Sequence, residues 1–413
     1  MNNEKRVRYA CYFTNISMSV VGNLPAILFL TFRRLYGLSY SLMGSLVLIN
    51  FFTQLIVDLI FSFFSHKINI SKAVKRIPII TIVGLLIYGL VPVFFKDFAV
   101  LGIIVGTVIF SAGSGFAEVL ISPVIAALPS DNPEREMSKL HSIYAWGVVG
   151  VVIVSTLFLL LVKNVNWYLL PLVFSIIPLI SLILFIKTSL PKIQTPEKTS
   201  GIIALIKNPT LWLFFIAMFL GGASELIMAQ WASSYLEQAL SIPKVWGDIF
   251  GVATFAVMLG LGRTLYAKFG KNIEKVLLLS CIGATVCYLS ASLINLPIAG
   301  LIACGLTGFC VAMLWPGTLI AASSRITTGG VFVYAMMAAG GDFGASAGPQ
   351  VVGIITDLAS ESGACLSLAN SLGLTIEQLS IKVGLLVGSL FPLIAILVYS
   401  LIYKSRKNSK VSV

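Results

Sequence analysis

The sequence predicts an all-α membrane protein with twelve transmembrane helices in two pseudo-symmetric six-helix bundles. Hydrophobic residues make up 58% of the 413 residues and charged residues 11%, whereas a soluble domain carries about 25% charged residues. Twelve apolar segments are each long enough to cross a bilayer, which takes about 20 residues in a helix. Residue patterns of the first six segments also recur in the last six. Lipid is therefore the expected solvent for most of this chain.

The predicted spans follow one another with mostly short loops. One longer stretch, from Lys187 to Pro209, divides the chain into an amino-terminal bundle (1–188), a cytoplasmic linker (189–209) and a carboxy-terminal bundle (210–413). A second one, from Leu358 to Lys382, is long enough to hold a short helix. The twelve spans cover residues 9–32, 41–65, 77–95, 98–128, 139–163, 167–187, 210–238, 246–269, 275–294, 297–324, 331–357 and 383–403.

Glycine and proline positions in the first half recur in the second. The fourth and tenth spans share a Gly-Phe pair followed by proline, and the fifth and eleventh spans share two glycines three residues apart. Together the matches indicate an internal duplication, and duplicated halves that move around a midplane site are a recurring transporter architecture. The matched residues are Gly115, Phe116 and Pro123 with Gly308, Phe309 and Pro316 at an offset of 193, and Gly147 and Gly150 with Gly341 and Gly344 at an offset of 194.

The formal net charge of +12 is distributed unevenly over the loops. By the predicted spans, 22 of the 28 lysines and arginines lie on one set of loops and both tails, and the opposite loops carry 6. This asymmetry follows the positive-inside rule, so we expect a multi-pass protein of the cell membrane with both termini in the cytoplasm. A nucleic-acid binder would collect its charge on a soluble module, which excludes nucleic acid as a partner.

Cysteine spacing and the position of one short motif argue against a metal site and a hydrolase site. The six cysteines form no C-x-x-C pair, so we expect small apolar fillers and no metal site. The stretch Gly344 to Gly348 fits the hydrolase pattern G-x-S-x-G. That motif needs a strand-to-helix turn, and here it lies within a predicted helix. We therefore expect no catalytic residues and no enzyme activity.

Four acidic residues lie inside predicted spans: Asp58, Glu118, Glu225 and Asp342. A carboxylate inside a membrane span is costly and is usually retained for a function. Glu118 has the best surroundings for proton coupling, because glycines and serines precede it and Pro123 loosens its helix. Asp58 on the second span is the other candidate for proton coupling. The alternative for each acid is helix packing with an incidental carboxylate.

Polar stripes run along three of the spans. Residues four apart share one helix face, and such stripes turn away from lipid. Asn15 and Asn23 lie on the first span, and Asn50 and Gln54 on the second, in line with Asp58. These side chains are candidates for binding a polar solute. The alternative is interhelical hydrogen bonding, worth about 0.6 kcal/mol for each bond on average.

The second half holds further candidates for the solute site. Glu225 and Asp342 lie near the middle of their spans, beside pairs of glycines, and Gln230 follows on the seventh span. Aromatic rings stack on sugars or on cations, although plain packing is an equal alternative. No lysine or arginine falls near a span centre, since Arg263 is in the cytoplasmic half of the eighth span. This acidic interior favours protons, cations or neutral polar ligands. The aromatic candidates are Trp146, Trp231 and Trp315.

The layout and these motifs resemble the major facilitator superfamily over nearly the whole chain. The closer likeness is to the branch of the fucose–proton symporter. The resemblance implies that Glu118 is the proton-coupling acid. The chain differs from that branch in the first span, which contains Asn15 and Asn23 but no acidic residue. The motifs that carry it are Gly115 with Glu118 and Pro123, Leu140 to Gly147, Gly221 to Glu225 with Trp231, and Gly340 with Gly348 and Pro349.

We expect a secondary active transporter that moves a small polar, sugar-like solute by alternating access. Proton-coupled import is the first interpretation, with the proton gradient as driving force, no cofactor and a monomeric protein in the lipid bilayer. The alternative is proton-driven efflux of organic cations or drugs, which acidic and aromatic sites also suit. A non-transporting receptor or scaffold would need a sizeable soluble module, and the chain predicts none.

The predicted topology can be tested by cysteine labelling of intact cells. An impermeant thiol reagent is expected to label Ser362→Cys and Thr375→Cys from outside, and to leave Ser200→Cys unlabelled, because the positive charge places the last position in the cytoplasm. Labelling of position 200 in intact cells would contradict the assignment.

Overall fold

The computed structural model describes residues 2–38, 40–64, 67–130, 133–162, 166–191, 193, 204–326 and 331–411. In these ranges every regular element is a helix, as the sequence predicts. Each predicted span coincides with one helix or with consecutive helical segments. Most of the predicted linker, residues 192 and 194–203, lies outside the described part.

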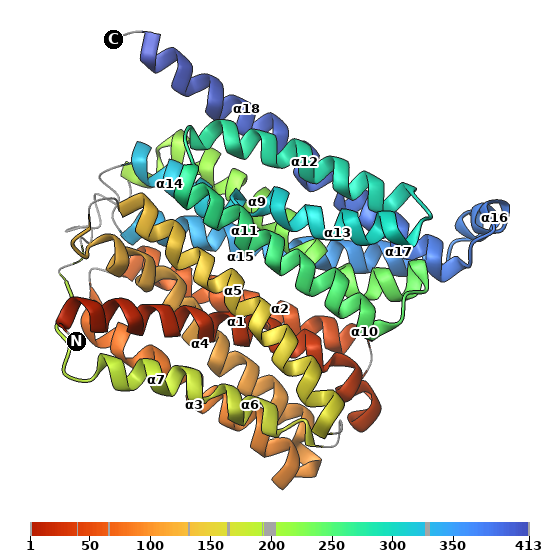
Figure 1. Cartoon of the computed structure of the whole chain (residues 1–413), viewed down its shortest axis with the longest axis horizontal. Coiled ribbons are helices and arrows are strands. Elements are labelled where there is room, and N and C mark those ends of the chain that lie inside the picture. Colours follow the sequence, from red (N-terminus) through yellow and green to blue (C-terminus); the bar gives the residue numbers. More distant parts are fainter. Residues whose placement is uncertain are drawn as a thin grey trace. The chain divides into compact units, whose positions relative to one another are not determined.

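The helices of the first six spans appear in red to yellow-green in Figure 1. Their order is α1 (Asn3–Tyr36), α2 (Tyr40–Phe64), α3 (Ile70–Phe94), the short 3-10 helix η2 (Lys96–Phe98), α4 (Ala99–Ala126), α5 (Pro133–Val162), α6 (Leu169–Phe174) and α7 (Ile176–Phe185).

The last six spans contain more breaks than the first six. The seventh span ends in a π-helical segment, and a second one follows the first α-helical turn of the eighth span. Such π-helical turns inside α-helices are frequent at functional sites. The elements are α9 (Pro209–Ser234), η4 (Tyr235–Ala239), α10 (Lys244–Gly247), η5 (Asp248–Ala253), α11 (Thr254–Phe269), α12 (Ile273–Leu293), α13 (Pro297–Val311), α14 (Leu314–Arg325), α15 (Val331–Ser360), α16 (Gly363–Leu372), α17 (Ile376–Gly388) and α18 (Leu390–Val411).

Among the described residues, eight helices are long and apolar enough to cross a membrane. The pair α15 and α16 passes the same test together but is bent by 82°. The side chain of Ser362 caps α16 by accepting a hydrogen bond from the Cys365 backbone, and Gly373 ends the helix at a φ of 68°. The short helix predicted between Leu358 and Lys382 is thereby confirmed.

The chain separates into two compact units. The first comprises residues 1–211 and 322–342, and the second comprises 212–321 and 343–413. The division falls inside α15, directly after Asp342. The division at a linker of residues 189–209, which the sequence predicts, stays a prediction.

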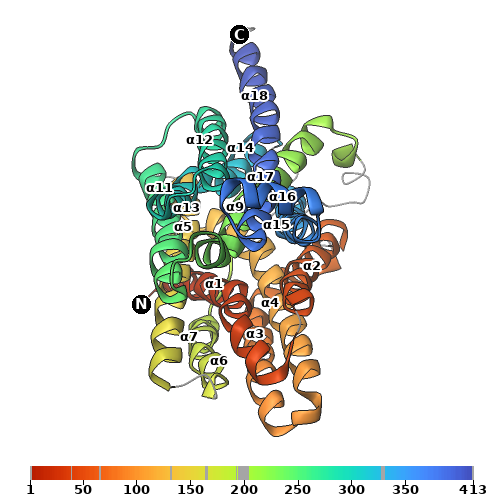
Figure 2. The ribbon, with the colours of Figure 1, turned by 90° about the vertical axis from the view of Figure 1, so that its right-hand side faces the viewer.

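Within the first unit, α1 packs against α5, α7 and α4, while α4 also contacts α2 and α3. In Figure 2 the helices α3 and α4 run side by side. Glycines permit this close approach: a Cβ at Gly113 would lie 2.6 Å from the Thr81 hydroxyl oxygen. Large side chains fill the space around them, and Tyr88, Phe110 and Trp167 are fully or almost fully buried.

Two glycines of the sequence repeat lie at corresponding helix contacts in the two units. A Cβ at Gly115 would be 3.0 Å from the Gln54 Cα, so the fourth span lies close against the second. Gly308 has the same relation to Phe255, so the tenth span lies close against the eighth. Gly147 faces Ser19 of the first span and Gly344 faces the Phe219 carbonyl of the seventh, but these two glycines do not match each other in the repeat. Equivalent packing contacts are therefore marked by the pair Gly115 and Gly308.

Gly344 and Gly150 occupy matching repeat positions with different surroundings, which makes them a matched pair. A Cβ at Gly344 would overlap the Phe219 backbone, whereas a Cβ at Gly150 meets nothing within 4 Å. We expect Gly344→Ala to lower stability by about 1–3 kcal/mol, the usual cost of overpacking, and Gly150→Ala to leave it unchanged. The unfolding temperature of the purified variants measures this. Equal stability of both variants would contradict the packing described.

Candidate functional site

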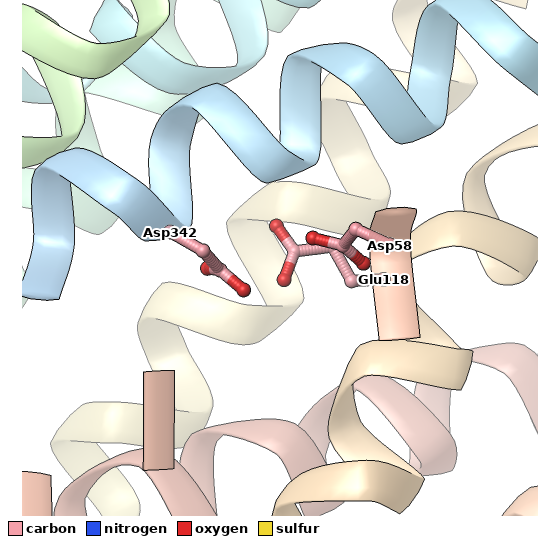
Figure 3. Close-up of side chains that lie close together, drawn as sticks. All are labelled: Asp58, Glu118 and Asp342. Carbon is pink, nitrogen blue, oxygen red and sulfur yellow. The ribbon is translucent and has the colours of Figure 1, made fainter. Parts of the chain in front are cut away.

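Three of the four embedded acids form one group. Asp58 on α2, Glu118 on α4 and Asp342 on α15 point toward one another (Figure 3). One carboxyl oxygen from each lies within 4.8 Å of the others. Asp58 and Asp342 are almost completely buried, and Glu118 is partly buried. We call these three residues the acid group.

The packing of α4 on α2 brings the first two acids together. Gly115 lies one turn before Glu118, and a Cβ there would be 3.0 Å from that of Val57, the neighbour of Asp58. On either side of the acids, apolar residues belong to one buried cluster: Val57, Phe61, Ala117, Val119 and Ala335. Apolar side chains of this cluster therefore flank the acids along their own helices.

Electrostatic repulsion decides what the acid group can do. At 4.8 Å two unit charges repel by about 3.5 kcal/mol in an effective dielectric of about 20. Three ionised carboxylates in a buried site would add such a penalty for each pair, so the group must hold at least one proton or another cation. A site of this kind can take up and release a positive charge when its surroundings change.

The sequence predicts Asp342 on the solute side together with Glu225. The structure brings Asp342 to Asp58 and Glu118, within the first unit. Sequence spacing could not indicate this, because Asp342 lies more than 200 residues from Glu118 and on a helix of the other sequence half. Which ligand Asp342 contacts stays a prediction.

Glu225 on α9 is paired with Arg263 on α11. The guanidinium Nη2 donates to both carboxylate oxygens, at 2.9 and 3.2 Å, and Nε donates to the Ala312 carbonyl at 2.9 Å. Both side chains are buried, with 6% and 2% of their surfaces exposed. The expectation of a purely acidic interior is therefore wrong for this half of the chain. An arginine inside an apolar span needs a partner as much as an acid does. The position of Arg263 within the eighth span could therefore have indicated an ion pair.

Asn50 joins three helices through its side-chain amide. Its Nδ2 donates to the Val21 carbonyl of α1 at 3.0 Å, while its Oδ1 accepts from Gln54 at 2.9 Å and from Ser111 of α4 at 2.8 Å. Asn50 and Gln54 are buried. These bonds match the alternative of interhelical hydrogen bonding, and Ser111 is a partner in addition to the residues predicted from the sequence.

The remaining candidate side chains differ in how deeply they are buried and in their hydrogen bonds. Asn15 is buried and donates to the Leu140 carbonyl at 2.6 Å, and Asn23 is partly buried and donates to the Ser19 carbonyl at 2.8 Å. Trp231 donates from Nε1 to the Pro349 carbonyl at 3.1 Å. Gln230 and Trp315 are partly buried, whereas 43% of the Trp146 side chain is exposed.

A comparison with protein families decides the classification. The model of the Major Facilitator Superfamily matches residues 9–349. The chain belongs to this superfamily. It is therefore a multi-pass membrane transporter and not an enzyme, as the sequence predicts.

Solved structures support the same fold at low sequence identity. The transporter FucP in the outward conformation has a TM-score of 0.68 and 15% identity over 94% of this chain and 98% of its own. A single-substitution form of the E. coli fucose:proton symporter FucP has a TM-score of 0.65 and 15% identity, covering 95% and 99%. The proton:xylose symporter XylE, bound to 6-bromo-6-deoxy-D-glucose, has a TM-score of 0.71 and 12% identity, covering 96% and 94%.

These likenesses confirm the twelve-helix, two-bundle fold class, and the family model confirms the resemblance to the major facilitator superfamily. At such low identity they concern the fold alone. The search among curated proteins found no match.

The Asn50 network makes a prediction about stability. Asn50→Ala removes three hydrogen bonds and Ser111→Ala removes one of them. At about 0.6 kcal/mol for each bond in a membrane protein, we expect Asn50→Ala to cost about 2 kcal/mol and Ser111→Ala about a third of that. Unfolding of the purified variants in mixed micelles measures the difference. Unchanged stability of Asn50→Ala together with lost solute binding would assign the residue to the solute site instead.

Proposed function

We propose that this transporter imports a small, neutral, sugar-like solute across the cell membrane together with protons. The observation that carries the proposal is the acid group, in which three carboxyl oxygens lie within 4.8 Å of one another in largely buried surroundings. Glu118 is the central residue of the proposed proton site, with Asp58 as its partner. Both termini are proposed to face the cytoplasm.

The acid group offers a physical link between proton binding and conformation. When Glu118 gives up its proton, repulsion among the three acids grows, and an arrangement that separates them becomes more favourable. Asp342 is the last residue that α15 contributes to the first unit, and the same helix continues into the second. A change in the position of Asp342 therefore has a covalent path to the second half of the chain, which suits alternating access around duplicated halves.

A neutral solute agrees with the charges of the candidate residues. The Arg263 guanidinium balances the Glu225 carboxylate, which leaves Asp342 as the acidic candidate for solute binding beside amide and aromatic groups. Asn23, Gln230 and Trp146 keep exposed surface, and hydroxyl-rich solutes bind to such groups by hydrogen bonds and stacking. The fold neighbours that are named as fucose and xylose symporters also favour a sugar-type solute.

The alternative function, proton-driven efflux of organic cations or drugs, rests on acids whose charge is unbalanced in the solute site. The pairing of Glu225 with Arg263 removes one of the two acids on which that interpretation depends. We therefore keep efflux as an outcome of the binding test below.

The proton role of Glu118 can be tested in proteoliposomes, with L-fucose and D-xylose as first probes after a ligand-induced thermal-shift screen of sugars, nucleosides and cationic drugs. Glu118→Gln keeps the size and hydrogen bonding of the side chain and removes its titration. We expect the variant to lose uphill accumulation driven by a proton gradient while it retains solute exchange.

Asp97→Asn, an exposed acid on η2, is the matched control and is expected to accumulate solute as the parent protein does. Undiminished proton-driven uptake by Glu118→Gln would rule out the proposed role. Accumulation that follows a sodium gradient and ignores the proton gradient would show that another cation occupies the acid group.

Asp342 separates the two candidate functions. For a neutral solute, loss of one charged acceptor in a buried site costs roughly 1.5–3 kcal/mol, or about 10- to 150-fold in affinity. We expect Asp342→Asn to weaken sugar binding by this factor. If it abolishes binding of a lipophilic cation such as tetraphenylphosphonium and spares every sugar, efflux is the better interpretation. Equal affinities for both ligand classes would leave Asp342 outside the solute site.

A further inference from the structure

The tenth span is broken between α13 and α14, close to the buried Glu225–Arg263 pair. Inside the break the Ala312 backbone N–H donates to the Phe309 carbonyl at 3.4 Å, and the Gly317 N–H donates to the Met313 carbonyl at 2.8 Å. A continuous helix would satisfy the Ala312 carbonyl with the N–H of residue 316. That residue is Pro316, which has no N–H to donate.

Arg263 supplies the missing donor. Its Nε donates to the Ala312 carbonyl at 2.9 Å, while its Nη2 is held by both oxygens of Glu225. Gly262, the residue before it, permits this approach, because a Cβ there would lie 2.6 Å from the Cβ of Ala312. One guanidinium group thus connects a carboxylate on α9 with the backbone at the break, through charge-assisted hydrogen bonds that are stronger than neutral ones.

The first half of the chain shows that proline alone does not produce the break. Pro123 matches Pro316 at the offset of 193, and it removes the helical donor of the Val119 carbonyl in the same way. Nevertheless α4 continues as one helix from Ala99 to Ala126. What distinguishes the tenth span is the side-chain donor from α11.

We propose that Arg263 is a positioning residue that fixes the interruption of the tenth span at Ala312 and Met313, and that Glu225 holds Arg263 in place. The interruption lies directly before α14 and Trp315, which is three residues beyond Ala312. A shift of the broken helix relative to α9 requires that the link from Glu225 through Arg263 to Ala312 opens. This role concerns the movement of the helix and is independent of the proposed proton site and solute.

Pro316→Ala provides a direct test, because alanine restores the N–H that the Ala312 carbonyl lacks. The measurement is residue-resolved hydrogen–deuterium exchange of the full-length protein in lipid nanodiscs, without ligand. The background is Glu225→Gln/Arg263→Gln, which removes the link without leaving a buried unpaired charge. We expect the amide exchange rates of residues 313–315 and 317–320 to rise about 10-fold or more in this double variant, because a hydrogen bond to a charged group is lost. Adding Pro316→Ala is expected to reverse most of this rise.

Residues of α12 are the internal control, since they report on the stability of the second unit away from the break. Arg263→Lys is the second variant: one ammonium keeps the charge beside Glu225 but cannot reproduce the fork that also reaches Ala312, so it is expected to raise exchange at the break alone. The proposal is overturned if exchange at the break does not change, if Pro316→Ala fails to reverse the rise, or if exchange in α12 rises equally in every variant, Arg263→Lys included.

Discussion

Repulsion among three buried carboxyl groups is the constraint on which the rest of this structure depends. Asp58, Glu118 and Asp342 lie within 4.8 Å of one another, and α2 and α4, which carry the first two acids, pack against each other. Gly115 permits α4 to lie against α2 beside the acids, and the Asn50–Ser111 hydrogen bond of 2.8 Å joins the same two helices about two turns away. The scaffold therefore keeps the acids together, and their shared charge has to be relieved by a bound cation, which we propose is a proton.

The two halves of the chain treat the same repeat element differently. In each half a glycine packs the repeat helix against its neighbour, and a proline eight residues later removes one helical hydrogen bond. In the first half the residue before the affected carbonyl is Glu118, and the helix remains continuous. In the second half the affected carbonyl is bound by Arg263, and the helix breaks. One half thus carries a group of acids that lie close together and the other a buried ion pair, which fits a division between a part that responds to protons and a part that shapes the solute path.

Much of the fold could be predicted because lipid imposes simple rules on sequence. Span length, loop charge and the repeat of glycine and proline are local features, so the helices, the all-α class and the helix between Leu358 and Lys382 could be read directly. Asp58 and Glu118 could both be assigned to proton coupling because each is an acid inside an apolar span of the first half. The partners of Asp342 and Glu225 could not be predicted, since these contacts depend on which helix faces pack against each other. For Glu225 the missing information was a cation on another helix: Arg263 was visible in the sequence, but only the fold shows that the guanidinium turns inward to a carboxylate.

The central claim is that the acid group holds a proton under conditions where isolated carboxyl groups are ionised, and infrared spectroscopy measures this most directly. The carbonyl stretch of a protonated carboxyl group is separate from the bands of a carboxylate, and deuterium exchange identifies it. In the purified protein at neutral pH the account predicts a protonated-carboxyl band that is absent from the folded triple variant Asp58→Asn/Glu118→Gln/Asp342→Asn. A parent spectrum without that band, or one that the triple variant reproduces, would contradict it.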